Sequence, residues 1–179
     1  MIIHLGNKLI NRILSKEKAQ KILDSKDNFF QLEINPDLVM DTYNIATGAF
    51  SPLEGFMTRN DYLSVLKNKR LESNIPWTLP ITLNTNNIHA KEKDDILLKD
   101  SEGNIIAILN IEEKFQHHKE EEAKPVFGTL DKSHPGVLHT FNQPELIISG
   151  KLNLIQRPKS KFEKFELTPE QTRSIFLGR

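Results

Sequence analysis

Cysteine is absent from the 179 residues of this chain. Its absence excludes disulfide bonds, thiolate-bound zinc and cysteine nucleophiles, and it is compatible with a reducing compartment. Long apolar runs are also missing, and no basic leader precedes the brief apolar stretch at the N-terminus, so the sequence predicts neither a membrane-spanning helix nor a signal peptide. We therefore expect a soluble, cytoplasmic protein without a membrane partner.

An excess of charge of either sign is absent as well: Lys and Arg total 24, and so do Asp and Glu. Proteins that bind nucleic acid through its phosphates usually carry a basic excess, so we do not expect a nucleic-acid partner. The length is that of one domain with a full hydrophobic core.

The sequence lacks the common motifs of catalysis. It has no Gly-X-X-X-X-Gly-Lys-Ser/Thr phosphate loop, no Gly-X-Gly-X-X-Gly turn and no Gly-X-Ser-X-Gly elbow. His117 and His118 point in different directions on any regular strand or helix, so we interpret both as surface histidines. The acidic run Glu120, Glu121 and Glu122 is interpreted as a solvated helix surface. From the residues alone, catalysis is not demonstrated.

What the sequence does contain is a dense turn segment between Ala46 and Met57. Ser51 can cap a short helix, with Pro52 at its first position and Glu54 where a capping box places a carboxylate. Gly48 and Gly55 flank the turn, and glycine there indicates either a positive φ or backbone packed too closely for a Cβ. We interpret the segment as a tight, buried connector. The predicted structural residues are Gly48, Ala49, Phe50, Ser51, Pro52, Leu53, Glu54, Gly55 and Phe56.

A second segment of loop residues lies between Gly128 and Val137. His134 is three residues from Asp131, so a hydrogen bond from the imidazole to a carboxylate or to the backbone can fix the loop before a short helix. The alternative is general acid–base catalysis or anion binding by His134, but no nucleophile or phosphate loop is nearby. We favour a structural role for Asp131, His134, Pro135 and Gly136.

Periodicity predicts helices mainly near the front of the chain and a cluster of strands behind them. Helices are expected at residues 16–23, after Asn35, after Thr58 and after Thr168, and strands at residues 29–34, 95–99, 105–115 and 144–155. This order indicates an α+β fold with a small curled sheet or barrel and several flanking short helices.

Several segments resemble, in the same order, the N-terminal domain of ATP sulfurylase (sulfate adenylyltransferase). The stretch from Gly48 to Met57 matches the family's Gly-Ala-Phe-Ser-Pro-Leu-Glu-Gly-Phe-Met signature. The other resembling segments are residues 4–9, 70–71, 76–83, 127–137 and 167–173, the first of which lacks the family's opening proline and second glycine. The resemblance implies a PUA-like domain over residues 1–157, a linker over 158–166 and the truncated start of the catalytic domain over 167–179.

In that family, ATP and sulfate bind in the following domain, through a Gln-X-Arg-Asn-Pro loop and a His-X-X-His motif. Here Gln171-Thr172-Arg173 is followed by Ser174-Ile175, and no His-X-X-His occurs. The resemblance therefore implies a non-catalytic domain that supports an absent catalytic domain, which transfers an adenylyl group from magnesium-ATP to sulfate. We therefore expect no catalytic, substrate-binding or metal residue and no cofactor in this chain. The expected partner is the catalytic domain, and formation of a homo-oligomer stays open.

Two alternatives belong to other classes. PUA-like domains can bind RNA, and Lys159, Lys161 and Lys164 form a candidate basic patch, although the neutral net charge disfavours this role. The other alternative is an enzyme whose site is formed by Arg70, Asp131 and His134.

Overall fold

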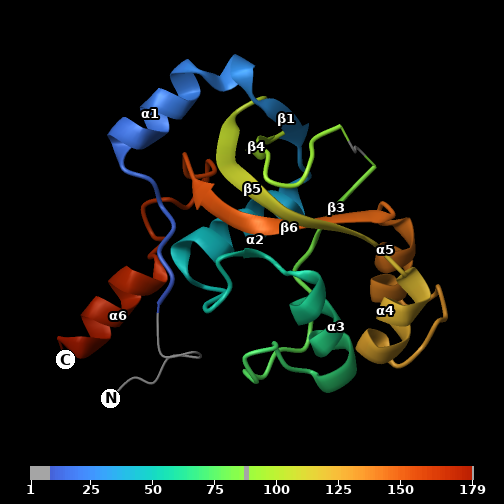
Figure 1. Cartoon of the computed structure of the whole chain (residues 1–179). Helices are drawn as coiled ribbons and strands as arrows, with labels where there is room; N and C mark the ends of the chain where they lie inside the picture. The colour runs from blue at the N-terminus through green and yellow to red at the C-terminus, as the bar shows by residue number, and fades with distance from the viewer. Residues whose placement is uncertain (1–8, 87–88, 179) are drawn as a thin grey trace. The chain divides into compact units, whose positions relative to one another are not determined.

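The structure, a computed structural model, describes residues 9–86 and 89–178. Its elements are α1 (Lys16–Asp24), the 3₁₀ turn η1 (Lys26–Asn28), β1 (Phe30–Glu33), α2 (Pro36–Thr47), β2 (Gly55–Phe56), α3 (Arg59–Asn68), β3 (Leu83–Thr85), β4 (Asp95–Lys99), β5 (Ile105–Gln116), α4 (Lys119–Phe127), α5 (Pro135–Asn142), β6 (Leu146–Leu154) and α6 (Pro169–Leu177) (Figure 1). The α+β prediction is confirmed. Of the resembling segment at residues 4–9, all but Leu9 lies outside the described residues.

The strands form one mixed sheet. Their order is β1-β4-β5-β6-β2, and β3 pairs with β6. β1 runs parallel to β4, whereas the β4–β5 and β3–β6 pairs are antiparallel. Among the described residues, the end strands β1 and β2 do not pair with each other, so the sheet is open and the closed-barrel alternative is wrong.

The chain divides into two compact units. The first comprises the residues up to Gly55, Asp95–Asn110 and the residues from Lys151 onward; the second comprises Phe56–Asp94 and Ile111–Gly150. In the first unit α1 packs on strand residues. The buried residues of this core cluster are Ala19, Leu97, Ile105 and Ile155.

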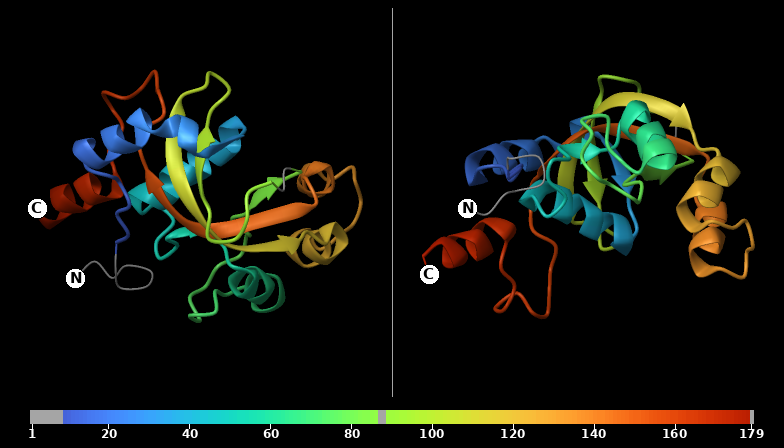
Figure 2. Two further views of the ribbon diagram at one scale, coloured as in Figure 1. Left: turned by 45° about the horizontal axis from the view of Figure 1, so that its top comes forward. Right: turned by 90° about the horizontal axis from the view of Figure 1, so that it is seen from below.

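In the second unit, α3 starts as predicted. The Thr58 hydroxyl accepts a hydrogen bond from the Asp61 N–H, and the helix buries Tyr62, Val65 and Leu66. α4 and α5 lie side by side (Figure 2). Among the helices of the described part, none combines the length and the apolar character needed to cross a membrane.

α2 of the first unit also starts as predicted. Asn35 accepts from the Leu38 N–H, Pro36 takes the first position, and Gly48 ends the helix with φ +87°. Within α2, Asp41 is partly buried and lies one turn after Asp37. Burial, and to a lesser degree the Asp37 charge, raise the pKa of Asp41 from 3.8 to about 6.

We expect Asp41→Asn to stabilise the protein at pH 7.5 by about 1 kcal/mol, a value reduced from the full shift because the carboxyl is partly exposed. The pKa of Asp41 is higher in the folded protein than in the unfolded chain, so the folded protein binds more protons between pH 3.8 and about 6. Stability therefore falls as the pH rises through this window, and the penalty is complete above it. Urea unfolding from pH 4 to pH 7.5 measures the effect.

The matched control is Asp27→Asn, which changes an exposed aspartate in the same unit. Its free energy of unfolding should stay within about 0.5 kcal/mol of the parent at both pH values. A stabilisation by Asp41→Asn that is as large at pH 4 as at pH 7.5 would contradict the prediction.

Candidate functional site

The segment that follows α2 is a turn and not the predicted short helix. Ser51 is buried, and its hydroxyl accepts from the Ile10 N–H at 3.0 Å and donates to the Gly48 carbonyl at 2.7 Å. A helix cap at Ser51 would need its hydroxyl oxygen to accept from the N–H groups of the residues that follow, but this oxygen accepts from the Ile10 N–H instead. The Ser51–Pro52 peptide bond is cis. The predicted helix cap at Ser51 is therefore wrong.

Glu54 does not close a capping box either. Its Oε2 lies 3.3 Å from Arg12 Nη1 and 3.3 Å from Lys151 Nζ, and its carbonyl accepts from the Leu152 N–H at 3.1 Å. Arg12 Nε donates to the Leu152 carbonyl at 2.6 Å. Glu54 thus ties the turn to the N-terminal strand-like segment and to β6 of the first unit. These ion pairs are partly exposed, so each contributes at most about 1 kcal/mol.

The remaining residues of the segment divide between burial and exposure. Leu53, Gly55 and Phe56 are buried, Phe50 and Pro52 are half-buried, and Ala49 is exposed. Gly48 has the positive φ that the sequence predicts. Gly55 lies in β2 and does not have a positive φ. Of the two explanations offered for glycine at this position, the positive φ is therefore wrong.

In the second unit, His134 caps α5. Its Nδ1 accepts from the Gly136 N–H at 3.2 Å, and Pro135 takes the first helical position. The imidazole packs on the Phe127 ring with centroids 5.1 Å apart, and a Cβ on Gly136 would lie 2.4 Å from that ring. The imidazole–backbone hydrogen bond that the sequence predicted is therefore present, and Gly136 leaves space for Phe127.

Asp131 bonds within the same loop. Its Oδ1 accepts from the Ser133 N–H at 2.9 Å, and hydrogen bonds from Ser133 lower the pKa of the Asp131 carboxyl. Arg70 Nη1 donates to the Asn74 carbonyl at 2.9 Å. Within the described residues, no hydrogen bond or ion pair joins Arg70 to Asp131 or His134. The geometry gives no support to an enzyme site built from these three residues.

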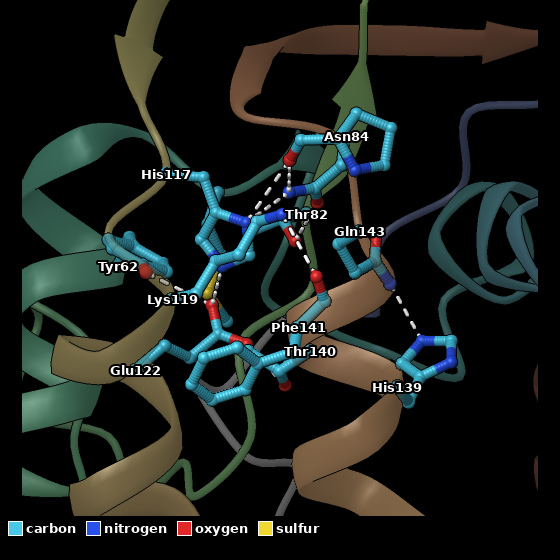
Figure 3. Close-up of polar contacts among 12 residues, drawn as sticks. Tyr62, Thr82, Asn84, His117, Lys119, Glu122, His139, Thr140, Phe141 and Gln143 are labelled. Atoms are coloured by element: carbon cyan, nitrogen blue, oxygen red, sulfur yellow. Dashed lines mark hydrogen bonds and ion pairs between the residues drawn. The ribbon is translucent and has the colours of Figure 1, made fainter. Parts of the chain in front are cut away.

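The sequence did not reveal a buried polar cluster in the second unit, named here the Glu122 cluster (Figure 3). Its members are Tyr62 of α3, Asn84 of β3, His117 after β5, Glu122 of α4 and Thr140 of α5. His117 exposes 3% of its surface and Glu122 9%, so the predictions of a surface histidine and a solvated glutamate are wrong for these two. His118 is exposed, as predicted.

Glu122 is the acceptor at the centre of the cluster. Its Oε2 accepts from the Tyr62 hydroxyl at 3.0 Å and lies 3.0 Å from His117 Nε2, and its Oε1 accepts from the Thr140 hydroxyl at 3.2 Å. Burial first, and the Glu122 carboxylate second, raise the pKa of the Tyr62 phenol far above its usual value. Tyr62 therefore remains protonated and donates to Glu122.

Asn84 and the Pro144 carbonyl both contact the Nδ1 side of His117. Asn84 Nδ2 donates to the Pro144 carbonyl at 3.2 Å and lies 3.0 Å from His117 Nδ1, while its Oδ1 accepts from the Thr82 hydroxyl at 2.8 Å. His117 Nδ1 thus faces an amide nitrogen, which donates, and also the Pro144 carbonyl oxygen at 3.2 Å, which accepts, while Nε2 donates to the Glu122 carboxylate. The side chains of the cluster thereby satisfy one another.

The cluster connects elements that are far apart in the sequence, and its contacts are those of a stabilising network. In residues 9–86 and 89–178, no group of three or more His, Cys, Asp or Glu side chains is placed to hold a metal ion.

A groove of about 430 Å³ is lined by residues of α2 and α6 of the first unit. Its lining residues are Tyr43, Asn44, Thr47, Ala49, Leu167, Thr168, Pro169, Thr172, Arg173 and Phe176. α6 begins after Thr168, as predicted, with a capping box in which the Thr168 hydroxyl accepts from the Gln171 N–H and the Gln171 side chain accepts from the Thr168 N–H. The box fixes the first turn of α6 at the groove.

Large apolar side chains are exposed along the same C-terminal region. They form what we name the C-terminal apolar surface: Phe162, Phe165, Leu167, Ile175, Phe176 and Leu177. Phe165 exposes 84% and Leu177 73%. A concentration of exposed apolar residues is typical of a surface that binds another protein segment.

Comparison with curated proteins finds enzymes named sulfate adenylyltransferase. That of Staphylothermus marinus is 40% identical over 174 residues, which cover 96% of this chain and 45% of the relative. That of Hyperthermus butylicus is 38% identical over 177 residues, which cover 97% of this chain and 45% of the relative. These relatives confirm the resemblance seen in the sequence. The chain spans about 45% of the length of the curated relatives it matches.

A solved structure titled "Hexameric APS kinase from Thiobacillus denitrificans" has a similar fold, with a TM-score of 0.75 at 22% identity. The match covers 99% of this chain and 32% of the other. Residues 2–157 match the family model described as a PUA-like domain. Since this match spans most of the sequence, and the open mixed sheet with short flanking helices agrees with it, the chain belongs to the PUA-like domain family.

Proposed function

We propose that this chain is the N-terminal, non-catalytic part of a sulfate adenylyltransferase and that it supports the catalytic part. In this proposal the catalytic part transfers the adenylyl group of ATP to sulfate and releases pyrophosphate. Support comes from relatives of that name that match 96–97% of this chain over 45% of their own length.

The observation that carries the proposal is the C-terminal apolar surface. Six large apolar side chains between Phe162 and Leu177 are exposed. Apolar area of this kind is stabilised by a partner that removes it from water, at about 25 cal/mol per Å². The catalytic part of the same type of enzyme is the partner that the relatives suggest.

Under this proposal the chain is inactive alone and has no cofactor of its own, and magnesium-ATP binds in the catalytic part. No residue of this chain takes a chemical role in adenylyl transfer. This chain contributes by packing against the catalytic part and stabilising the folded state of that part.

The test is sulfate-dependent ATP–pyrophosphate exchange. It is measured for this chain, for the remaining part of the Staphylothermus marinus enzyme, and for their mixture; a covalent fusion replaces the mixture if the separate partner is insoluble. We expect no exchange with the chain alone and at least about tenfold more exchange for the mixture than for the partner alone, a difference of about 1.4 kcal/mol.

Activity of the chain alone would overturn the non-catalytic assignment, and a mixture no more active than the partner would overturn the supporting role. Light scattering on the same samples reports whether the chain forms a homo-oligomer. RNA binding, the alternative role, predicts a salt-dependent gel shift with structured RNA. In the candidate basic patch, Lys159 Nζ lies 3.1 Å from a Glu102 carboxylate oxygen, which reduces the charge available to phosphates.

A further inference from the structure

The groove between α2 and α6 is lined by one face of each helix. On α6, Pro169, Thr172, Arg173 and Phe176 follow the i, i+3, i+4, i+7 spacing of a single helical face. On α2, the lining residues Tyr43, Asn44 and Thr47 also share one side. The groove is therefore a regular feature of two packed helices, and both helices belong to the first unit.

Among the described residues that line the groove, only Arg173 has a charged side chain. Its Nη1 is buried and has no hydrogen-bond partner. In residues 9–86 and 89–178, no hydrogen bond or ion pair of the Arg173 side chain is formed. A partly buried guanidinium without an acceptor is unfavourable, because its N–H groups lose water and gain nothing in return.

The acidic residues of α2 and α6 do not line the groove, so none of them is placed to pair with Arg173 there. Glu170 of α6 accepts from Asn11 Nδ2 at 3.2 Å, and none of Glu170, Asp37 and Asp41 lines the groove. The other walls are hydroxyl and amide groups or apolar surfaces such as Leu167 and Phe176. The groove thus offers one positive charge, a few polar groups and apolar walls.

We propose that this groove receives an apolar segment of the catalytic part that carries a carboxylate side chain, and that Arg173 pairs with this carboxylate. The inference rests on the proposed function and adds the chemistry of the contact. A planar guanidinium suits a carboxylate because the two groups can form parallel hydrogen bonds. A single cation between apolar walls does not match a polyanion, which needs several clustered cations. Phe176 and Leu167 belong both to the groove lining and to the exposed apolar residues of the C-terminal region, so the two features share these residues.

The experiment measures binding between the full chain and the remaining part of the Staphylothermus marinus enzyme by isothermal titration calorimetry. Arg173→Gln removes the charge and keeps a polar side chain. We expect it to weaken binding about tenfold or more, since truncating one member of a desolvated charge pair is costly. The matched control Arg59→Gln changes an exposed arginine of the other unit and should leave binding within about twofold.

A second readout separates recognition from folding. Because Arg173 has no partner among the described residues, Arg173→Gln should leave the melting temperature of the free chain unchanged or slightly higher. A clear loss of melting temperature would show that Arg173 has a structural partner in the free chain, and it would overturn the inference.

The outcomes also separate this inference from the proposed function. If the parent chain does not bind the catalytic part, both fail together. If the parent binds and Arg173→Gln binds equally tightly, the proposed function stands and the Arg173 contact is refuted. Weakened binding by Arg173→Gln with an unchanged melting temperature supports both.

Discussion

Glu122→Ala is expected to lower the free energy of unfolding by about 3–5 kcal/mol. The substitution removes the oxygens that accept from the hydroxyls of Tyr62 and Thr140 and from His117 Nε2. All three donors are buried, so none of them gains a water molecule in exchange without rearrangement. Urea unfolding at neutral pH, followed by circular dichroism, measures the loss.

Glu121→Ala is the matched control, because Glu121 precedes Glu122 on α4 but is exposed. Its free energy of unfolding should stay within about 0.5 kcal/mol of the parent. Glu122→Gln should fall between the two, with a loss of about 1–3 kcal/mol, since one oxygen still accepts and the new amide nitrogen cannot. Equal losses for Glu121→Ala and Glu122→Ala would refute the account of the Glu122 cluster.

Local signals predicted the helix starts well. The caps at Asn35 and Thr58 and the capping box at Thr168 and Gln171 all appear in the structure. Each cap depends on atoms within three residues, so neighbouring residue types decide the outcome. Such contacts need no knowledge of the rest of the fold.

Long-range partners explain the predictions that were wrong. Ser51 and Pro52 have the residue types of a helix start, but the Ser51 hydroxyl bonds the Ile10 N–H, whose residue lies 41 positions earlier in the chain. Glu54 likewise pairs with Arg12, 42 positions away. A cap competes with every other donor and acceptor that folding brings close, and a single sequence does not show these competitors.

His117 could have been placed by strand periodicity. At alternate positions of β5, Leu109, Ile111 and Phe115 are buried and Glu113 is half-buried, and His117 continues this alternation just after the strand while His118 falls on the other side. The strand pattern does not predict the polar residues around His117, since Asn84 lies 33 positions earlier in the chain and Tyr62 lies earlier still. The α2–α6 groove was unpredictable for the same reason, because it requires two helices that are distant in sequence to pack together.

Gly48→Ala is expected to destabilise the protein by about 3 kcal/mol or more. Two causes act together at this position. The backbone has φ +87°, which a residue with a Cβ adopts only at a cost. A Cβ would also lie 2.2 Å from the Ile10 carbonyl oxygen and 3.1 Å from the Ser51 hydroxyl oxygen. Because the nearest atom belongs to the backbone, relief requires movement of the segment that carries Ile10, and the Ile10–Ser51 hydrogen bond would be strained as well.

Gly103→Ala separates these two causes. Gly103 has φ +83°, close to the value at Gly48, but nothing lies within 4 Å of the position a Cβ would take. Its replacement should therefore cost only the backbone preference, about 1 kcal/mol. Parallel urea unfolding of the two variants gives the steric contribution at Gly48 as a difference. Equal losses would mean that the backbone beside Gly48 shifts freely. A clearly larger loss for Gly48→Ala would show that the turn after α2 is held rigidly against the Ile10 backbone, as its hydrogen bond to Ser51 requires.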